Sequence, residues 1–210
     1  MGFAKTERAA LCDALLEFGP DAPTLCEGWD AHDLAVHVWM RENDPLGVAG
    51  SFIKPLAGVT EARTEAVRTR WTYPDLVERI RKGPGLASLF AIPAVDELAN
   101  TGEFFIHTED VRRANGQGPR DLGREFEESV AKALVTTAKP LLRDVDAGVV
   151  FERTDASESL RVKPGASTIT IIGKPSEILL FAFGRMDQAE VEVVGEPSVV
   201  AKVRATHKGF

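Results

Sequence analysis

The sequence predicts an α+β protein with a helical N-terminal part and a small mixed C-terminal part. Apolar residues recur at spacings of three and four up to about residue 142, a pattern typical of amphipathic helices. After Asp144, short runs rich in valine and isoleucine alternate with polar residues, which indicates strands. This change predicts one unit over residues 1–144 and a second over residues 145–210.

Start and stop signals locate the helices of the first part. Asp30 and Thr72 are good N-caps, and Gly19-Pro20 and Gly83-Pro84 are stop signals. The expected helices cover residues 4–18, 30–43, 60–70, 72–82, 95–114 and 122–142. Residues 46–58 carry few charges and several small residues, so we expect a loop or a lid there. The core candidates of the last helix are Phe126, Val130, Leu134 and Val135.

The second part should contain four strands and two helices. The expected strands cover residues 149–153, 159–162, 167–172 and 189–194. The expected helices cover residues 175–183 and 197–204, and each begins at a proline.

Composition narrows the classes of partner. The net charge of −7 would repel a phosphate backbone, so we expect no nucleic-acid partner. The longest apolar run, residues 178–183, is too short to span a bilayer, and no membrane partner is expected. The sequence has two cysteines, Cys12 and Cys26, and we expect both to behave as small buried hydrophobic residues. Such a low number favours a reducing environment and so a cytoplasmic location.

A line of polar residues runs along the helix expected at residues 95–114. At 100° per residue, five side chains share one face with apolar neighbours on both sides: Asp96, Asn100, Glu103, His107 and Asp110. This line should point into the helical core, where unpaired carboxylates are costly and a bound cation would offset the cost. The opposite side carries Glu109, Arg112 and Arg113, which we expect in water. Leu98 and Phe105 also lie outward, and we expect them to pack on the second unit or on another subunit, as in a homodimer.

Three residues form a candidate metal site. Glu103 and His107 are spaced i, i+4 and can hold one ion, and His37 shares a stripe with Leu34 and Val38 that should face the core. Three protein ligands leave a position open, which is typical of catalytic sites. The ligand types suit zinc, nickel or iron. The residues alone leave open a plain Glu103–His107 pair and a satisfied core His37.

Two segments resemble a known family. The spacing Trp29-x-x-x-Asp33-Leu34-x-x-His37 resembles the first metal-binding segment of DinB-like proteins, and residues 100–114 resemble the second. The chain resembles the mycothiol-dependent maleylpyruvate isomerase group, whose E-x-x-x-H is matched by Glu103 and His107. Many other DinB-like proteins have H-x-x-x-H. The resemblance implies a four-helix bundle plus an extra helix, with zinc the first expectation at His37, Glu103 and His107.

The C-terminal part is similar to the same group. Residues 175–185, ending in Gly184-Arg185, resemble a helix of its small sterol-carrier-like domain. That resemblance implies that Arg185 faces the metal cleft as a catalytic clamp for an anion, since a guanidinium binds a carboxylate through two hydrogen bonds. An ordinary surface arginine that closes a helix is the alternative.

The resemblance also implies a reaction. A low-molecular-weight, mycothiol-like thiol would serve as nucleophile in S-transfer or cis–trans isomerisation of a small electrophilic substrate, because a metal lowers the pKa of a bound thiol. Asp110 and Asn100 would support the ligands by hydrogen bonds. Two alternatives remain. One is a metal-dependent hydrolase with Asp96, Asp110 or His32 as general base. The other is a non-enzymatic protein that binds a metal or a small molecule.

Overall fold

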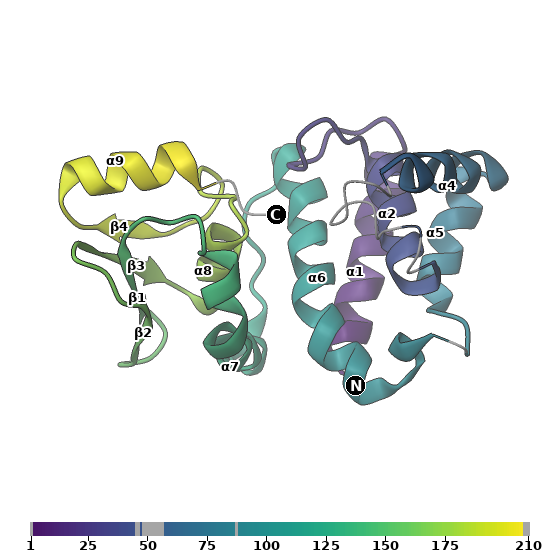
Figure 1. Cartoon of the computed structure of the whole chain (residues 1–210). Helices are drawn as coiled ribbons and strands as arrows, with labels where there is room; N and C mark the ends of the chain where they lie inside the picture. The colour runs from purple at the N-terminus through teal and green to yellow at the C-terminus, as the bar shows by residue number, and fades with distance from the viewer. Residues whose placement is uncertain (1, 45–46, 48–56, 87, 208–210) are drawn as a thin grey trace. The chain divides into compact units, whose positions relative to one another are not determined.

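Two units make up the chain, and they meet in sequence between Gly118 and Pro119. The computed structural model describes residues 2–44, 47, 57–86 and 88–207, and Figure 1 shows its elements. The predicted α+β class is confirmed, because the first unit is built from helices and the second contains a sheet. The expected loop or lid at residues 46–58 lies outside the described residues, apart from Gly47, Ala57 and Gly58.

The helices of the first unit end where the sequence predicts, but two of them begin earlier than expected, at Ala57 instead of residue 60 and at Pro93 instead of residue 95. They are α1 (Phe3–Phe18), α2 (Ala31–Asn43), α4 (Ala57–Arg70), α5 (Tyr73–Lys82), the 3-10 turn η3 (Leu89–Ala91) and α6 (Pro93–Ala114). Gly19 and Gly83 end α1 and α5 with φ of 84° and 85°, a conformation that favours glycine. Asp30 caps α2, and its side chain accepts a hydrogen bond from the backbone N–H of Asp33 at 2.7 Å.

Packing in this unit joins α1 to α6 and α5, and α2 to α4 and α5. The shared core is apolar, and large side chains from four helices are fully buried in it: Leu11, Leu15, Leu34, Leu76, Ile80 and Phe104. Because α2 and α6 both contribute to this core, their polar residues are held on a rigid support. No helix in the described part of the chain is long and apolar enough to cross a membrane.

The second unit is a four-stranded sheet with helices. Its elements are α7 (Gly123–Leu141), β1 (Gly148–Arg153), β2 (Ser159–Lys163), β3 (Thr168–Gly173), α8 (Pro175–Ala182), β4 (Glu192–Val194) and α9 (Pro197–Thr206). The strand order is β2-β1-β3-β4, with β1 and β3 parallel and the outer pairs antiparallel. Val149 and Phe151 pair with Ile169 and Ile171, and all four side chains are buried.

Helix α7 belongs to the second unit by its contacts with α8 and β2. The carboxylate of Glu127 accepts hydrogen bonds from the backbone N–H and the hydroxyl of Ser176, at 2.9 and 2.8 Å. It therefore ties α7 to the start of α8, where backbone N–H groups lack partners within the helix. The sequence placed this helix with the first unit, because helical periodicity does not reveal which element the apolar face packs against.

Two sequence expectations about exposure are wrong. Val135 was expected in the core but is 59% exposed, whereas its neighbour Leu134 is buried. Glu109 and Arg113 were expected in water but are buried, with Nε of Arg113 donating to the Glu109 carboxylate at 2.7 Å. Each charge offsets the other, which permits burial that a polar sequence pattern does not suggest. Of the two outward apolar residues, Leu98 is 80% exposed and Phe105 is buried.

Candidate metal centre

Helices α2 and α6 bring His37, Glu103 and His107 together. Oε1 of Glu103 lies 3.6 Å from Nε2 of His37 and 3.3 Å from Nε2 of His107. The ligand atoms of the three residues all lie within 4.8 Å of one another. The side chains are mostly covered but keep some access to solvent, with exposed fractions of 26%, 19% and 10%. The spacing argument from the sequence therefore selects residues that meet in the structure.

Aromatic contacts orient the two imidazoles. The ring of Trp29, the residue before the N-cap of α2, lies 5.1 Å from the ring of His37, measured between centroids. The rings of His37 and His107 meet edge to face, with centroids 5.4 Å apart. Such packing restrains the rotation of an imidazole, so its nitrogen atoms keep one direction. This favours a site that is formed before an ion binds.

Asp110 supports His107 from behind. Nδ1 of His107 lies 2.9 Å from Oδ2 of Asp110, and the side chain of Asp110 is fully buried. A carboxylate accepts, so Nδ1–H donates and the Nε2 lone pair is directed to the other side. Such a carboxylate–histidine pair is typical of histidines that bind metals.

The thiol of Cys26 reaches the same carboxylate. Its Sγ donates to Oδ2 of Asp110 at 3.2 Å, so Cys26, His107 and Asp110 form a second group whose atoms could hold a cation. The sequence indicated only a small hydrophobic residue here. Nothing in its spacing places Cys26 near Asp110, 84 residues later. Cys12 does behave as a buried hydrophobic residue, and burial raises the pKa of its thiol to about 12.

The charges at the centre are strongly coupled. Burial alone would raise the pKa of Glu103, but hydrogen bonds with His107 and His37 outweigh it and hold that pKa well below the ordinary value. Burial alone would also lower the pKa of His107. Its hydrogen bond with Asp110, together with contacts to Cys26 and Glu103, raises that pKa well above the ordinary value instead. Without a cation, a proton on the imidazole of His107 stabilises this centre.

The donor set fits a divalent cation. Tetrahedral zinc sites have metal–nitrogen and metal–oxygen distances of about 2.0–2.1 Å, which places neighbouring ligand atoms roughly 3.3 Å apart. The contacts of Glu103 with the two imidazoles, at 3.3 and 3.6 Å, are close to that spacing. Three ligands would leave a position for a further molecule. His37, Glu103 and His107 are thus the residues that could hold the ion.

The other residues singled out from the sequence fall in different places. Asn100 and Asp96 are hydrogen-bonded to each other at 2.7 Å, in a buried network next to the centre. His32 lies against Tyr73, with ring centroids 5.3 Å apart, and belongs to neither group that could hold a cation. Arg185 lies in the second unit, after α8, and its Nη1 donates to the carbonyl of Phe183 at 2.6 Å. Its assignment as an anion clamp stays a prediction.

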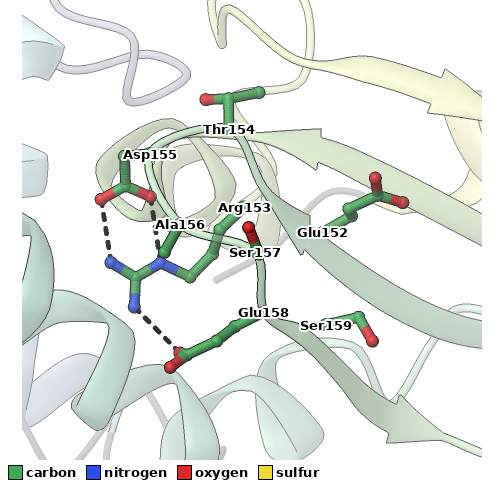
Figure 2. Close-up of a pocket in the computed structure, with 8 residues that line it drawn as sticks. All are labelled: Glu152, Arg153, Thr154, Asp155, Ala156, Ser157, Glu158 and Ser159. Carbon is green, nitrogen blue, oxygen red and sulfur yellow. Dashed lines mark hydrogen bonds and ion pairs between the residues drawn. The ribbon is translucent and has the colours of Figure 1, made fainter.

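A hollow in the second unit lies at the β1–β2 turn. It has a volume of about 670 Å³ and is lined by residues 152–159, as Figure 2 shows. Arg153 at its centre donates to the carboxylates of Asp155, Glu128 and Glu158. Because three carboxylates surround this guanidinium, it offers no positive field for an anion.

Comparison with known proteins gives a likeness of fold. No protein-family model and no curated protein matches the chain. Among solved structures, the chain is similar to the mycothiol-dependent maleylpyruvate isomerase, with a TM-score of 0.49 and 16% identity over 92% of this chain and 91% of that one. A histidine-to-alanine mutant of that enzyme gives 0.49 and 14% identity over 93% of both chains. These matches concern the fold alone.

Proposed function

We propose that the chain is a metal-dependent enzyme that uses a low-molecular-weight thiol in S-transfer or cis–trans isomerisation of a small electrophilic substrate. His37, Glu103 and His107 would hold the ion, with zinc the first expectation and nickel or iron as alternatives. When bound, the cation would supply Lewis acidity that lowers the pKa of a thiol at the open position. We further propose a DinB-like first unit and a sterol-carrier-like second unit, with Arg185 as a clamp for an acidic substrate.

The convergence of the three ligand atoms within 4.8 Å carries this proposal. Asp110 adds to it by holding a proton at Nδ1 of His107, which keeps Nε2 available to an ion. The nucleophile would belong to the thiol, so the chain itself needs no activated serine or cysteine. The mycothiol dependence named for the similar structures suggests which thiol to test first.

Hydrolysis is less well supported by the side chains of this centre. A metal hydrolase needs a general base close to the attacking water. Asp96 is engaged by Arg8 at 3.0 Å, and Asp110 is fully buried against His107. His32 packs on Tyr73 instead. None of these three candidates is therefore a ready base beside the three ligands.

A non-enzymatic binding protein is the second candidate, and one observation favours it. The second unit contains a mostly apolar cavity of about 200 Å³, with walls formed by Leu134, Phe151, Leu160, Pro175 and Ile178 among others. A cavity of that size and character suits a small apolar molecule. In this case the metal centre would serve stability or sensing.

Metal content and thiol-dependent turnover test the proposal together. We would measure bound metal by elemental analysis in the native protein, in His107→Ala and in the control His32→Ala, which removes a histidine of α2 outside the centre. We expect about one equivalent of metal in the native protein and the control, and loss in His107→Ala. Turnover of maleylpyruvate and of other small unsaturated acids would then be compared with mycothiol, with other thiols and without thiol.

The outcomes separate the candidates. Turnover only with a thiol supports the proposal, whereas equal ester hydrolysis without thiol assigns a hydrolase. Bound metal without any turnover favours the binding protein. A native protein that stays empty after incubation with zinc, nickel and iron would overturn the catalytic metal centre, and the polar line on α6 would then be an internal charge network.

A further inference from the structure

Arg41 of α2 joins the metal centre to a buried polar network. Its Nε lies 3.2 Å from Oε1 of Glu103, the same oxygen that faces the two imidazoles. Nη1 donates to the side-chain oxygen of Asn100, and Nη2 donates to the carbonyl of Ala99 at 3.2 Å. The guanidinium also lies over the ring of Phe90, 4.9 Å from its centroid. These contacts fix the position and the plane of the guanidinium.

Asn100 is itself fixed by acceptors on two helices. Its Nδ2 donates to Oε1 of Glu42 at 2.9 Å and to Oδ1 of Asp96 at 2.7 Å, and its side chain is fully buried. With both N–H groups directed at carboxylates, the amide can only present its oxygen to Arg41. Asparagine fits this position because its amide N–H groups donate two hydrogen bonds while its oxygen accepts one, which an aspartate of the same size cannot do.

The carboxylates that hold Asn100 are balanced by Arg8 of α1. Arg8 donates to both oxygens of Glu42, at 2.5 and 2.6 Å, and to Asp96 at 3.0 Å. Two guanidiniums thus face three carboxylates once Glu103 is included, which leaves about one negative charge toward the metal centre. The contact between Arg41 and Glu103 joins this network to the metal centre.

We propose that Asn100 is a positioning residue for the metal centre, which acts through Arg41 on the carboxylate of Glu103. This inference rests on the proposed function, because it assigns Glu103 as a ligand. Asn100 lies one turn before Glu103 on α6, and Arg41 bridges the two side chains from the facing helix. The bridge restrains Glu103 so that Oε1 faces the imidazoles. The positive charge of Arg41 also makes that oxygen a weaker donor to the metal.

A charge-only role for Arg41 makes a different prediction from a positioning role. Lysine keeps the charge, but a single ammonium does not reproduce the planar fork that contacts Glu103, Asn100 and the backbone at once. If position matters, Arg41→Lys should weaken metal binding as Asn100→Ala does. If only charge matters, Arg41→Lys should bind metal like the native protein.

A double-mutant cycle with cobalt(II) tests the inference. Affinity would be measured by competition with a chromogenic chelator for the native protein, Asn100→Ala, Arg41→Lys and the double variant. We expect each single change to weaken binding by roughly tenfold or more, with an altered visible spectrum of the bound cobalt. The double variant should be no weaker than Arg41→Lys alone, because both changes break one chain of contacts. Arg63→Lys, at the exposed pair with Asp44, is the matched control.

A second readout needs no metal. The Nε–H signal of Arg41 in a ¹⁵N-labelled protein, identified by its loss in Arg41→Lys, should shift in Asn100→Ala. The inference would be overturned if a folded Asn100→Ala or Arg41→Lys variant bound cobalt with the affinity and the spectrum of the native protein. It would also be overturned if the loss of affinity in the double variant equalled the product of the two single losses. A native protein that takes up no cobalt would overturn the metal centre as well. Coupled losses without any thiol-dependent turnover would support the inference and defeat only the proposed catalysis.

Discussion

Nδ1 of His107 lies 2.9 Å from Oδ2 of Asp110, three residues later on α6, and this contact decides which nitrogen of the imidazole faces Glu103. The proton stays on the side of Asp110, and Nε2 lies 3.3 Å from Oε1 of Glu103. The pair therefore determines whether His107 can act as a ligand, although Asp110 itself lies behind the ring.

We expect Asp110→Asn to weaken metal binding by about 10- to 100-fold. The amide can donate to Nδ1, which would move the imidazole proton to Nε2 and block the ligand position. Dissociation constants from chelator competition would measure the effect. Asp13→Asn is the control, because the Asp13 carboxylate is 72% exposed on α1 and far in sequence from the centre. Unchanged affinity in Asp110→Asn would show that His107 does not depend on Asp110.

Metal binding should release a proton at neutral pH. The pKa of His107 is raised well above its ordinary value, against the effect of burial, first of all by Asp110. The metal-free imidazole is therefore protonated below that pKa, and an ion gains Nε2 only when the proton leaves. Affinity should rise with pH until it passes the raised pKa. Calorimetric titrations in two buffers of different ionisation enthalpy would measure the release, and identical heats would contradict it. Asp110→Asn should release less.

Cys26 should not be a ligand of the ion. His107 is shared by the set with His37 and Glu103 and by the set with Cys26 and Asp110, and one ion cannot use both sides of the ring. We expect Cys26→Ser to keep about one equivalent of metal and His37→Ala to lose it. The cobalt(II) protein should lack sulfur-to-metal charge transfer when no external thiol is present. The reverse pattern would assign the ion to Cys26 and Asp110.

Helical periodicity explains why much of the centre could be predicted. Glu103 and His107 are four residues apart on α6, so a helix alone puts them on one face. His37 followed from the apolar stripe that directs α2 toward the core. Cys26 could not be found in this way, because it lies in the turn-rich segment before α2. Its contact with Asp110 depends on how that segment passes α6.

The same limit applies to exposure and to unit boundaries. Periodicity identified α7 as a helix with an apolar face, and the contacts that assign it to the second unit come from α8 and β2. It also missed the buried pair of Glu109 and Arg113, since two opposite charges four residues apart look like a solvated face. The unit to which α7 belongs is decided by contacts with other elements of the fold. The burial of Glu109 depends on its charge partner Arg113, which lies on the neighbouring turn of α6.

Neighbouring residues of α7 give a matched test of its orientation. Leu134 is 3% exposed and Val135 is 59% exposed, so truncation of the first creates a cavity and truncation of the second removes little contact. We expect Leu134→Ala to lower the free energy of unfolding by about 2–5 kcal/mol, and Val135→Ala to change it by less than about 0.5 kcal/mol. Urea denaturation followed by circular dichroism would measure both. A comparable loss in Val135→Ala would mean that another surface covers Val135 in solution, since an exposed methyl pair cannot contribute that much by itself.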